Sequence, residues 1–156
     1  MQEARTYNVY TSTTVTDGGV STQGTGDNLN GFIVLVRPAV AATFLMNITS
    51  ASGTFTCVIQ RGIHAPIGDN GLPTTATPKD IQWFDYASFT TTTATGRRIL
   101  PVVYTSTAND SAVTSTGAML PNTQLGGPLG TLFRGAHRLS GASPSYTFSV
   151  VGEFEF

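Results

Sequence analysis

The chain has 156 residues and a formal net charge of −1, and only 11% of its residues are charged, against about 25% in typical soluble proteins. With 40% hydrophobic residues, it is too apolar to be disordered. Without a basic excess it lacks the charge that phosphate binding requires, so we expect no nucleic-acid partner. The length predicts one domain, residues 1–156. Lys occurs once, and a surface so poor in charge indicates that much of it lies against another protein.

The N-terminus carries no basic segment followed by an apolar run, so we expect no signal peptide and synthesis in a cytoplasm. The longest apolar stretch, Phe32–Met46, is interrupted by Arg37 and Pro38, so we expect no membrane span and no membrane partner. Cys57 is the only cysteine and has no basic neighbour to activate it. We interpret it as a small apolar residue of the core.

Apolar and polar residues alternate with a period of two along most of the chain, which is typical of half-buried β-strands. The alternation predicts strands over about 6–15, 29–36, 43–49, 54–60, 81–89, 97–104, 131–139 and 145–156. Residues 50–53 between two of them indicate a hairpin turn. No helical stripe with caps is present. We therefore expect an all-β fold, an antiparallel β-sandwich or jelly roll of about eight strands.

Two connections are unusually long, residues 62–79 and residues 106–130. Loops of this length without structure of their own are uncommon in compact domains. Both contain large apolar side chains, which indicates that these loops pack against another protein surface, either a partner subunit or their own domain. We expect arms that contact a partner subunit; loops folded over their own sandwich are the alternative.

The last strand is also long, because residues 145–156 would span about 40 Å at about 3.3 Å per residue. We expect residues 152–156 to extend beyond the domain and pair with a neighbour. Residues 1–5 are predicted to form an N-terminal arm, and the sequence leaves open whether this arm exchanges between subunits. A bulge at Gly152 that returns the strand to its own sheet is the alternative. The residues expected at subunit contacts are Ile67, Leu72, Met119, Leu120, Leu125, Phe154 and Phe156.

Candidate catalytic and metal-binding residues are few. His64 and His137 are the only histidines, and neither lies in a nucleophile or metal-ligand motif. His137 falls on a predicted strand, where we expect a structural role. Gly68–Gly71 resembles a calcium loop only faintly and indicates a turn. We expect no catalytic residue, no cofactor and no metal ligand. Seven of the eight basic residues are Arg, the cation that protein interfaces favour.

Several segments together resemble a known group of proteins. A strand with the sequence SASGTFTCVIQRG precedes WFDYASF, and the chain closes with LFRGAHRLSGASPSYTFSV. This order resembles small structural proteins of tailed-bacteriophage virions over about Phe32–Val151, less the two long loops. The residues that match the closing motif are Phe133, Arg134, Gly141, Ser143, Pro144, Ser145, Tyr146, Thr147, Phe148, Ser149 and Val150.

The resemblance implies a non-enzymatic protein that decorates and stabilises the exterior of a capsid. It also implies a homo-oligomer, commonly a trimer, that contacts the major capsid protein. A tail or head–tail accessory protein is an alternative. A carbohydrate- or receptor-binding β-sandwich module is another, and it would expose Trp or Tyr side chains, whereas we expect Trp83 in the core.

Overall fold

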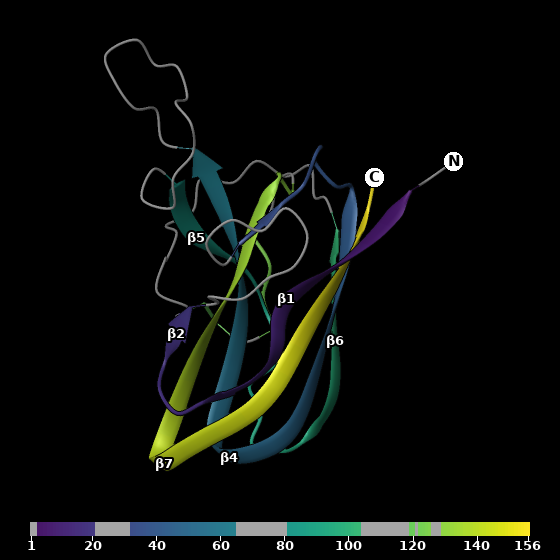
Figure 1. The fold of residues 1–156 in the computed structure, drawn as a ribbon. Helices are drawn as coiled ribbons and strands as arrows, with labels where there is room; N and C mark the ends of the chain where they lie inside the picture. Colours follow the sequence, from purple (N-terminus) through teal and green to yellow (C-terminus); the bar gives the residue numbers. More distant parts are fainter. Residues whose placement is uncertain (1–2, 21–31, 65–80, 104–118, 121, 126–128) are drawn as a thin grey trace.

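A computed structural model describes residues 3–20, 32–64, 81–103, 119–120, 122–125 and 129–156, and this part of the chain contains strands and no helix (Figure 1). The strands are β1 (Ala4–Val15), β2 (Gly19–Val20), β3 (Ile33–Val34), β4 (Ala41–His64), β5 (Ile81–Ser88), β6 (Gly96–Val103) and β7 (Leu132–Glu155). All paired strands run antiparallel. The predicted all-β antiparallel fold is confirmed.

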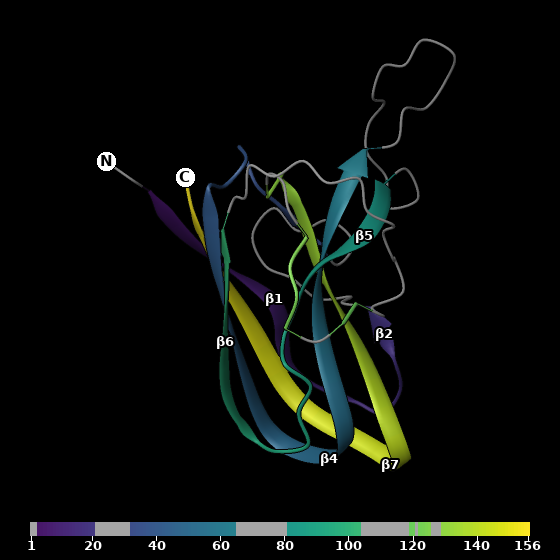
Figure 2. The same ribbon diagram turned by 180° about the vertical axis from the view of Figure 1, so that it is seen from behind.

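The centre of the fold is a two-stranded ribbon of β4 and β7, each 24 residues long. They pair from Ala41 opposite Glu155 to Gly62 opposite Leu132. The ribbon bends near its middle, so that its two ends lie opposite each other as the arms of a V (Figures 1 and 2). Seven strands thus form one sheet folded over on itself.

The bend divides this sheet into two half-sheets. In the first half-sheet the order is β1, the C-terminal part of β7, the N-terminal part of β4, and β6. In the second, the C-terminal part of β4 pairs with β5, and the N-terminal part of β7 pairs with β2 and β3. The half-sheets face each other across the core, and the β4–β7 ladder is interrupted at the bend, between Ser52 opposite Ser145 and Thr54 opposite Ser140.

Two glycines with positive φ, Gly53 (88°) and Gly141 (133°), lie side by side at the bend. A Cβ atom on Gly53 would approach the Ser140 carbonyl oxygen to 2.6 Å. The Tyr146 hydroxyl donates to the Gly53 carbonyl at 2.6 Å and fixes the chain there. Close approach and positive φ both favour glycine.

The predicted hairpin at residues 50–53 is wrong. Residues 43–49 and 54–60 do not pair with each other; both belong to β4 and pair with β7 on either side of the bend. Residues 131–139 and 145–156 likewise form the single strand β7. The turn-forming residues of β4, which include Gly53, lie opposite Gly141 of β7. Because both strands carry such residues at the same point, the two-stranded ribbon bends there and β4 does not fold back on itself.

The core lies between the two half-sheets and is rich in aromatic rings. Phe55 stacks on Tyr146 with ring centroids 4.8 Å apart and meets Phe148 at 4.7 Å. Phe133 and Phe154, one from each end of β7, meet at 5.1 Å. Cys57 is fully buried among these side chains, which confirms its interpretation as a core residue.

The C-terminal residues remain within the sheet, so the expected overhang at residues 152–156 is wrong. Phe154 lies opposite Arg5 of β1 on one side and Ala42 of β4 on the other. The Phe156 amide donates to the Glu3 carbonyl at 2.9 Å. Residues 3–5 of the expected N-terminal arm therefore pair with their own C-terminus.

Candidate interaction surface

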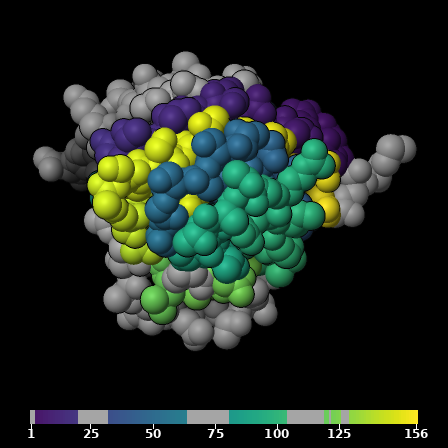
Figure 3. Space-filling view, turned by 90° about the horizontal axis from the view of Figure 1, so that it is seen from below, coloured from purple at the N-terminus to yellow at the C-terminus, as the bar shows by residue number. Residues whose placement is uncertain are grey.

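The side of the first half-sheet that points away from the core is a broad four-stranded face. Because side chains alternate across a strand, this outer face is formed by every second residue of β1, β7, β4 and β6. We define it by Thr6, Asn8, Thr43, Leu45, Asn47, Arg97, Ile99, Pro101, Val103, Ser149, Val151 and Glu153. In Figure 3, bands of β1 (purple), β7 (yellow), β4 (blue) and β6 (teal) follow one another in this order.

Apolar side chains form a row across the middle of the outer face. Val151 lies opposite Leu45, and Leu45 lies opposite Ile99. Ile99 is 68% exposed and Leu45 is 40% exposed, although each belongs to a strand. A shallow hollow of about 260 Å³ lies along this row and is also lined by Thr6, Thr43 and Glu153. Contiguous exposed apolar side chains of this kind are typical of interaction sites.

Charge is sparse on the outer face: besides Glu155 at the end of β7, the charged residues are Arg97 on β6 and Glu153 on β7. Neither takes part in the ion pairs found within the described residues, which join Glu3 to Arg5 and to Arg37. The remaining polar positions carry Thr, Asn and Ser. Such a face loses little charge solvation when it is covered, since burying a charge is costly and burying a hydroxyl is less so.

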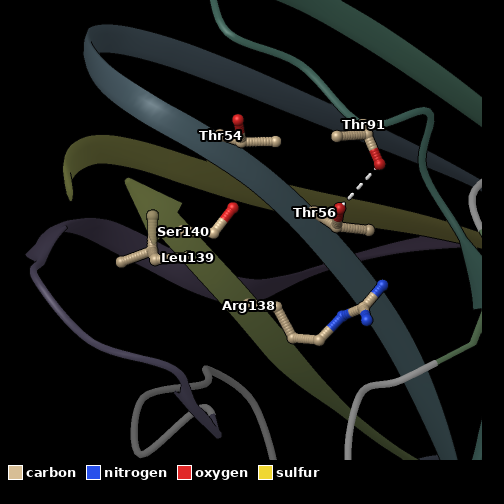
Figure 4. A pocket seen from close by; sticks show the side chains of 6 residues that line it. All are labelled: Thr54, Thr56, Thr91, Arg138, Leu139 and Ser140. Carbon is tan, nitrogen blue, oxygen red and sulfur yellow. Dashed lines mark hydrogen bonds between the residues drawn. The ribbon is translucent and has the colours of Figure 1, made fainter. Parts of the chain in front are cut away.

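A second hollow, of about 280 Å³, lies on the second half-sheet near the bend (Figure 4). It is lined by Thr54, Thr56, Thr91, Arg138, Leu139 and Ser140. Thr56 and Thr91 hydrogen-bond to each other at 2.8 Å, and an Arg138 guanidinium nitrogen donates to the Met119 carbonyl at 3.4 Å. The lining offers hydroxyl groups and one guanidinium to a polar ligand. The hydrogen bonds within the chain show that Thr56, Thr91 and Arg138 also have a structural role.

A buried polar cluster lies on the same half-sheet. The Gln60 amide donates to the Asp85 carboxylate at 2.7 Å, and the Arg134 Nε donates to the Gln60 carbonyl oxygen at 2.7 Å. The Arg134 guanidinium also lies over the Trp83 ring at 4.4 Å. Trp83, half-buried, packs against a small cluster that includes Phe32 rather than within the main core. These contacts satisfy buried polar groups and hold β4, β5 and β7 together.

His137 has two hydrogen-bond partners and faces the core. Its Nε2 donates to the Asp17 carbonyl at 2.8 Å, so its Nδ1 accepts the proton of the Tyr10 hydroxyl at 3.0 Å. Burial lowers the pKa of His137 and raises the pKa of Tyr10, which keeps both groups neutral. The expected structural role of His137 accords with this geometry. Among the described residues no group of His, Cys, Asp or Glu could hold a metal ion.

The predicted contact residues are scattered over the molecule. Ile67 and Leu72 lie outside the described residues. Phe154 is completely buried in the core of its own chain, so its assignment to a subunit contact is wrong. Phe156 and Leu125 are partly buried against that core, which leaves them limited surface to offer.

The described end of the second long loop lies over its own sheet. The Ser88 amide donates to the Thr123 carbonyl and the Leu125 amide donates to the Tyr86 carbonyl, so residues 122–125 extend the edge of β5. Met119 bonds through its amide to the Asp85 carboxylate at 3.1 Å. Leu120 is 73% exposed. For these residues the alternative of a loop folded over its own domain holds.

The sequence interpretation missed the outer face, although two residues signal it. Leu45 and Val151 are apolar side chains at positions where the alternation of β4 and β7 otherwise places polar ones.

The chain matches no known family model, and no curated protein is significantly similar to it. No helix long and apolar enough to cross a membrane occurs in the part of the chain that the structure describes.

Proposed function

We propose that the chain is a non-enzymatic structural protein of a tailed-phage virion, which decorates the capsid exterior as a homo-oligomer and stabilises the shell. The observation that carries this proposal is the outer face. It exposes apolar and hydroxyl side chains over four strands and holds few charges. A face of this composition suits a protein that works with this side covered.

The closing sequence motif supports the proposal in a second way. Its residues are the ones that shape the bend: Gly141 lies against Gly53, and Tyr146 fixes the Gly53 carbonyl. A motif that specifies a bent ribbon is a property of the whole fold rather than of one turn. The motif thus specifies the architecture of this chain, and we infer the decoration role from its resemblance to virion proteins.

The proposal is tested by adding the purified chain to expanded capsids of the phage that encodes it. We expect saturable co-sedimentation and a higher unfolding temperature of the shell, since a ligand at about 100 times its Kd stabilises what it binds by about 2.7 kcal/mol. Unexpanded procapsids serve as the control. A chain that ignores expanded capsids at micromolar concentration would refute the decoration role.

Immunogold labelling of intact virions separates the decoration role from its neighbours. Gold over the head supports capsid decoration, and gold at the tail or neck supports the accessory role instead. No label on the virion, with binding to a glycan or cell surface, would favour a recognition module.

A further inference from the structure

Arg97 and Glu153 occupy symmetric positions on the outer face. Glu153 lies on β7 opposite Thr43, which is two residues from Leu45 along β4. Arg97 lies on β6 opposite Asn47, which is two residues from Leu45 in the other direction. With about 4.8 Å between strands and about 6.7 Å between residues on one side of a strand, each charge lies about 8 Å from Leu45. Arg97 and Glu153 lie on opposite sides of Leu45.

This arrangement is self-complementary. A two-fold axis that lies in the plane of the interface above Leu45, perpendicular to the line joining the two charges, places Glu153 of one copy opposite Arg97 of the other. The same rotation places the second Arg97 opposite the second Glu153, because every contact across a two-fold axis occurs twice. Leu45 then meets Leu45 of the second copy at the centre.

We propose that the outer face binds the outer face of a second copy of this chain through this two-fold contact. The inference deepens the proposed assembly function, on which it rests in treating the face as an interface, and it names the occupant. The contact has an apolar centre of Leu45, Val151 and Ile99. Two ion pairs flank that centre, in the usual arrangement of a protein interface with a polar rim.

The charges are available for this contact. Within the described part of the chain, neither Arg97 nor Glu153 forms an ion pair, whereas Glu3 pairs with Arg5 and with Arg37. Glu155, two residues beyond Glu153 on β7, lies on the same side of the strand, so two acidic residues and one basic residue leave the face with a small negative charge.

A face contact also fits the chain better than strand addition at β6, which pairs only with β4 among the described strands. Pro101 lies within β6. Its missing backbone N–H removes a donor that an added strand would need, and proline is a common means of blocking an edge. We therefore expect β6 to contact a partner through its side chains and not through backbone hydrogen bonds at its free edge.

The experiment is sedimentation velocity across a dilution series of the wild type, Arg97→Glu and Glu153→Arg. We expect wild-type dimers, or hexamers if a three-fold contact exists elsewhere, and at least a tenfold higher dissociation constant for each variant alone, because each sets like charges against each other. An equimolar mixture of the two variants restores the contact as a heterodimer. The double variant, Arg97→Glu with Glu153→Arg, restores it as a homodimer.

Arg138→Glu is the matched control, because Arg138 is an exposed arginine on the other half-sheet, and its dissociation constant should equal that of the wild type. Rescue by mixing also shows that both single variants are folded. The proposal is overturned if the wild type stays monomeric at about 100 μM, where even weak contacts form. It is equally overturned if single variants associate as the wild type does, or if mixing restores nothing. Capsid binding that persists in those cases would leave the decoration role intact and assign the face to the capsid instead.

Discussion

His137 shows how a single residue couples the fold to pH. Because burial lowers its pKa below the ordinary value of 6.5, the unfolded chain binds a proton more readily than the folded chain does. Its contribution to stability is therefore complete above pH 6.5 and is lost as the pH falls through the folded-state pKa. Protonation of Nδ1 also removes the acceptor for the Tyr10 hydroxyl.

We expect the free energy of unfolding to decrease between about pH 7.5 and about pH 5 by a larger amount in the wild type than in His137→Gln, which cannot titrate there. Denaturant titration at the two pH values measures this difference. His64 is present in both proteins and cancels in the comparison. An equal decrease in both would show that His137 contributes no pH dependence.

At the scale of the element, alternation identified the strands but not their joining. Residues 43–49 and 54–60 carry the right pattern, and so do residues 131–139 and 145–156, yet each pair forms one strand. The local residues Ser50–Gly53 are as compatible with a tight turn as with a bend. Only the pairing of β4 with β7 at distant positions decides between them, and period-two patterns contain no information on which strands pair.

The bend provides a test of that joining. Gly53→Ala combines a positive φ with a Cβ atom 2.6 Å from the Ser140 carbonyl oxygen, and we expect it to lower the free energy of unfolding by about 2–4 kcal/mol. Gly96→Ala is the control, since its φ is +135° but a Cβ atom there meets nothing within 4 Å. Thermal and denaturant unfolding compare the two. Equal losses would mean that crowding at the bend contributes nothing.

At the scale of the whole molecule, composition predicted a surface that is covered but not where it lies. The long loops and the final strand contain large apolar side chains without an evident core position, so the sequence predicted the subunit contacts there. Phe154 proved to be core, and residues 122–125 extend the edge of β5. The outer face was hidden because its members come from four separate strands, and they meet only through the register of the sheet.

The outer face is therefore a part of the surface where the low charge of the chain is evident. Leu45, Ile99 and Val151 interrupt polar positions on the one face where a hollow forms, and ordinary solvent-exposed sheets carry charge there. We propose that this face is covered in the working assembly. A probe placed on the face tests that claim directly.

The most direct measurement is the rate of maleimide labelling of Thr43→Cys. Cys57 is fully buried and burial raises the pKa of its thiol, so the introduced cysteine is the only reactive one. Gln82→Cys, exposed on β5, is the matched control. We predict that assembly on capsids slows labelling of Thr43→Cys at least tenfold relative to dilute protein and leaves Gln82→Cys unchanged. Equal labelling of Thr43→Cys in the dilute and assembled states would contradict the account.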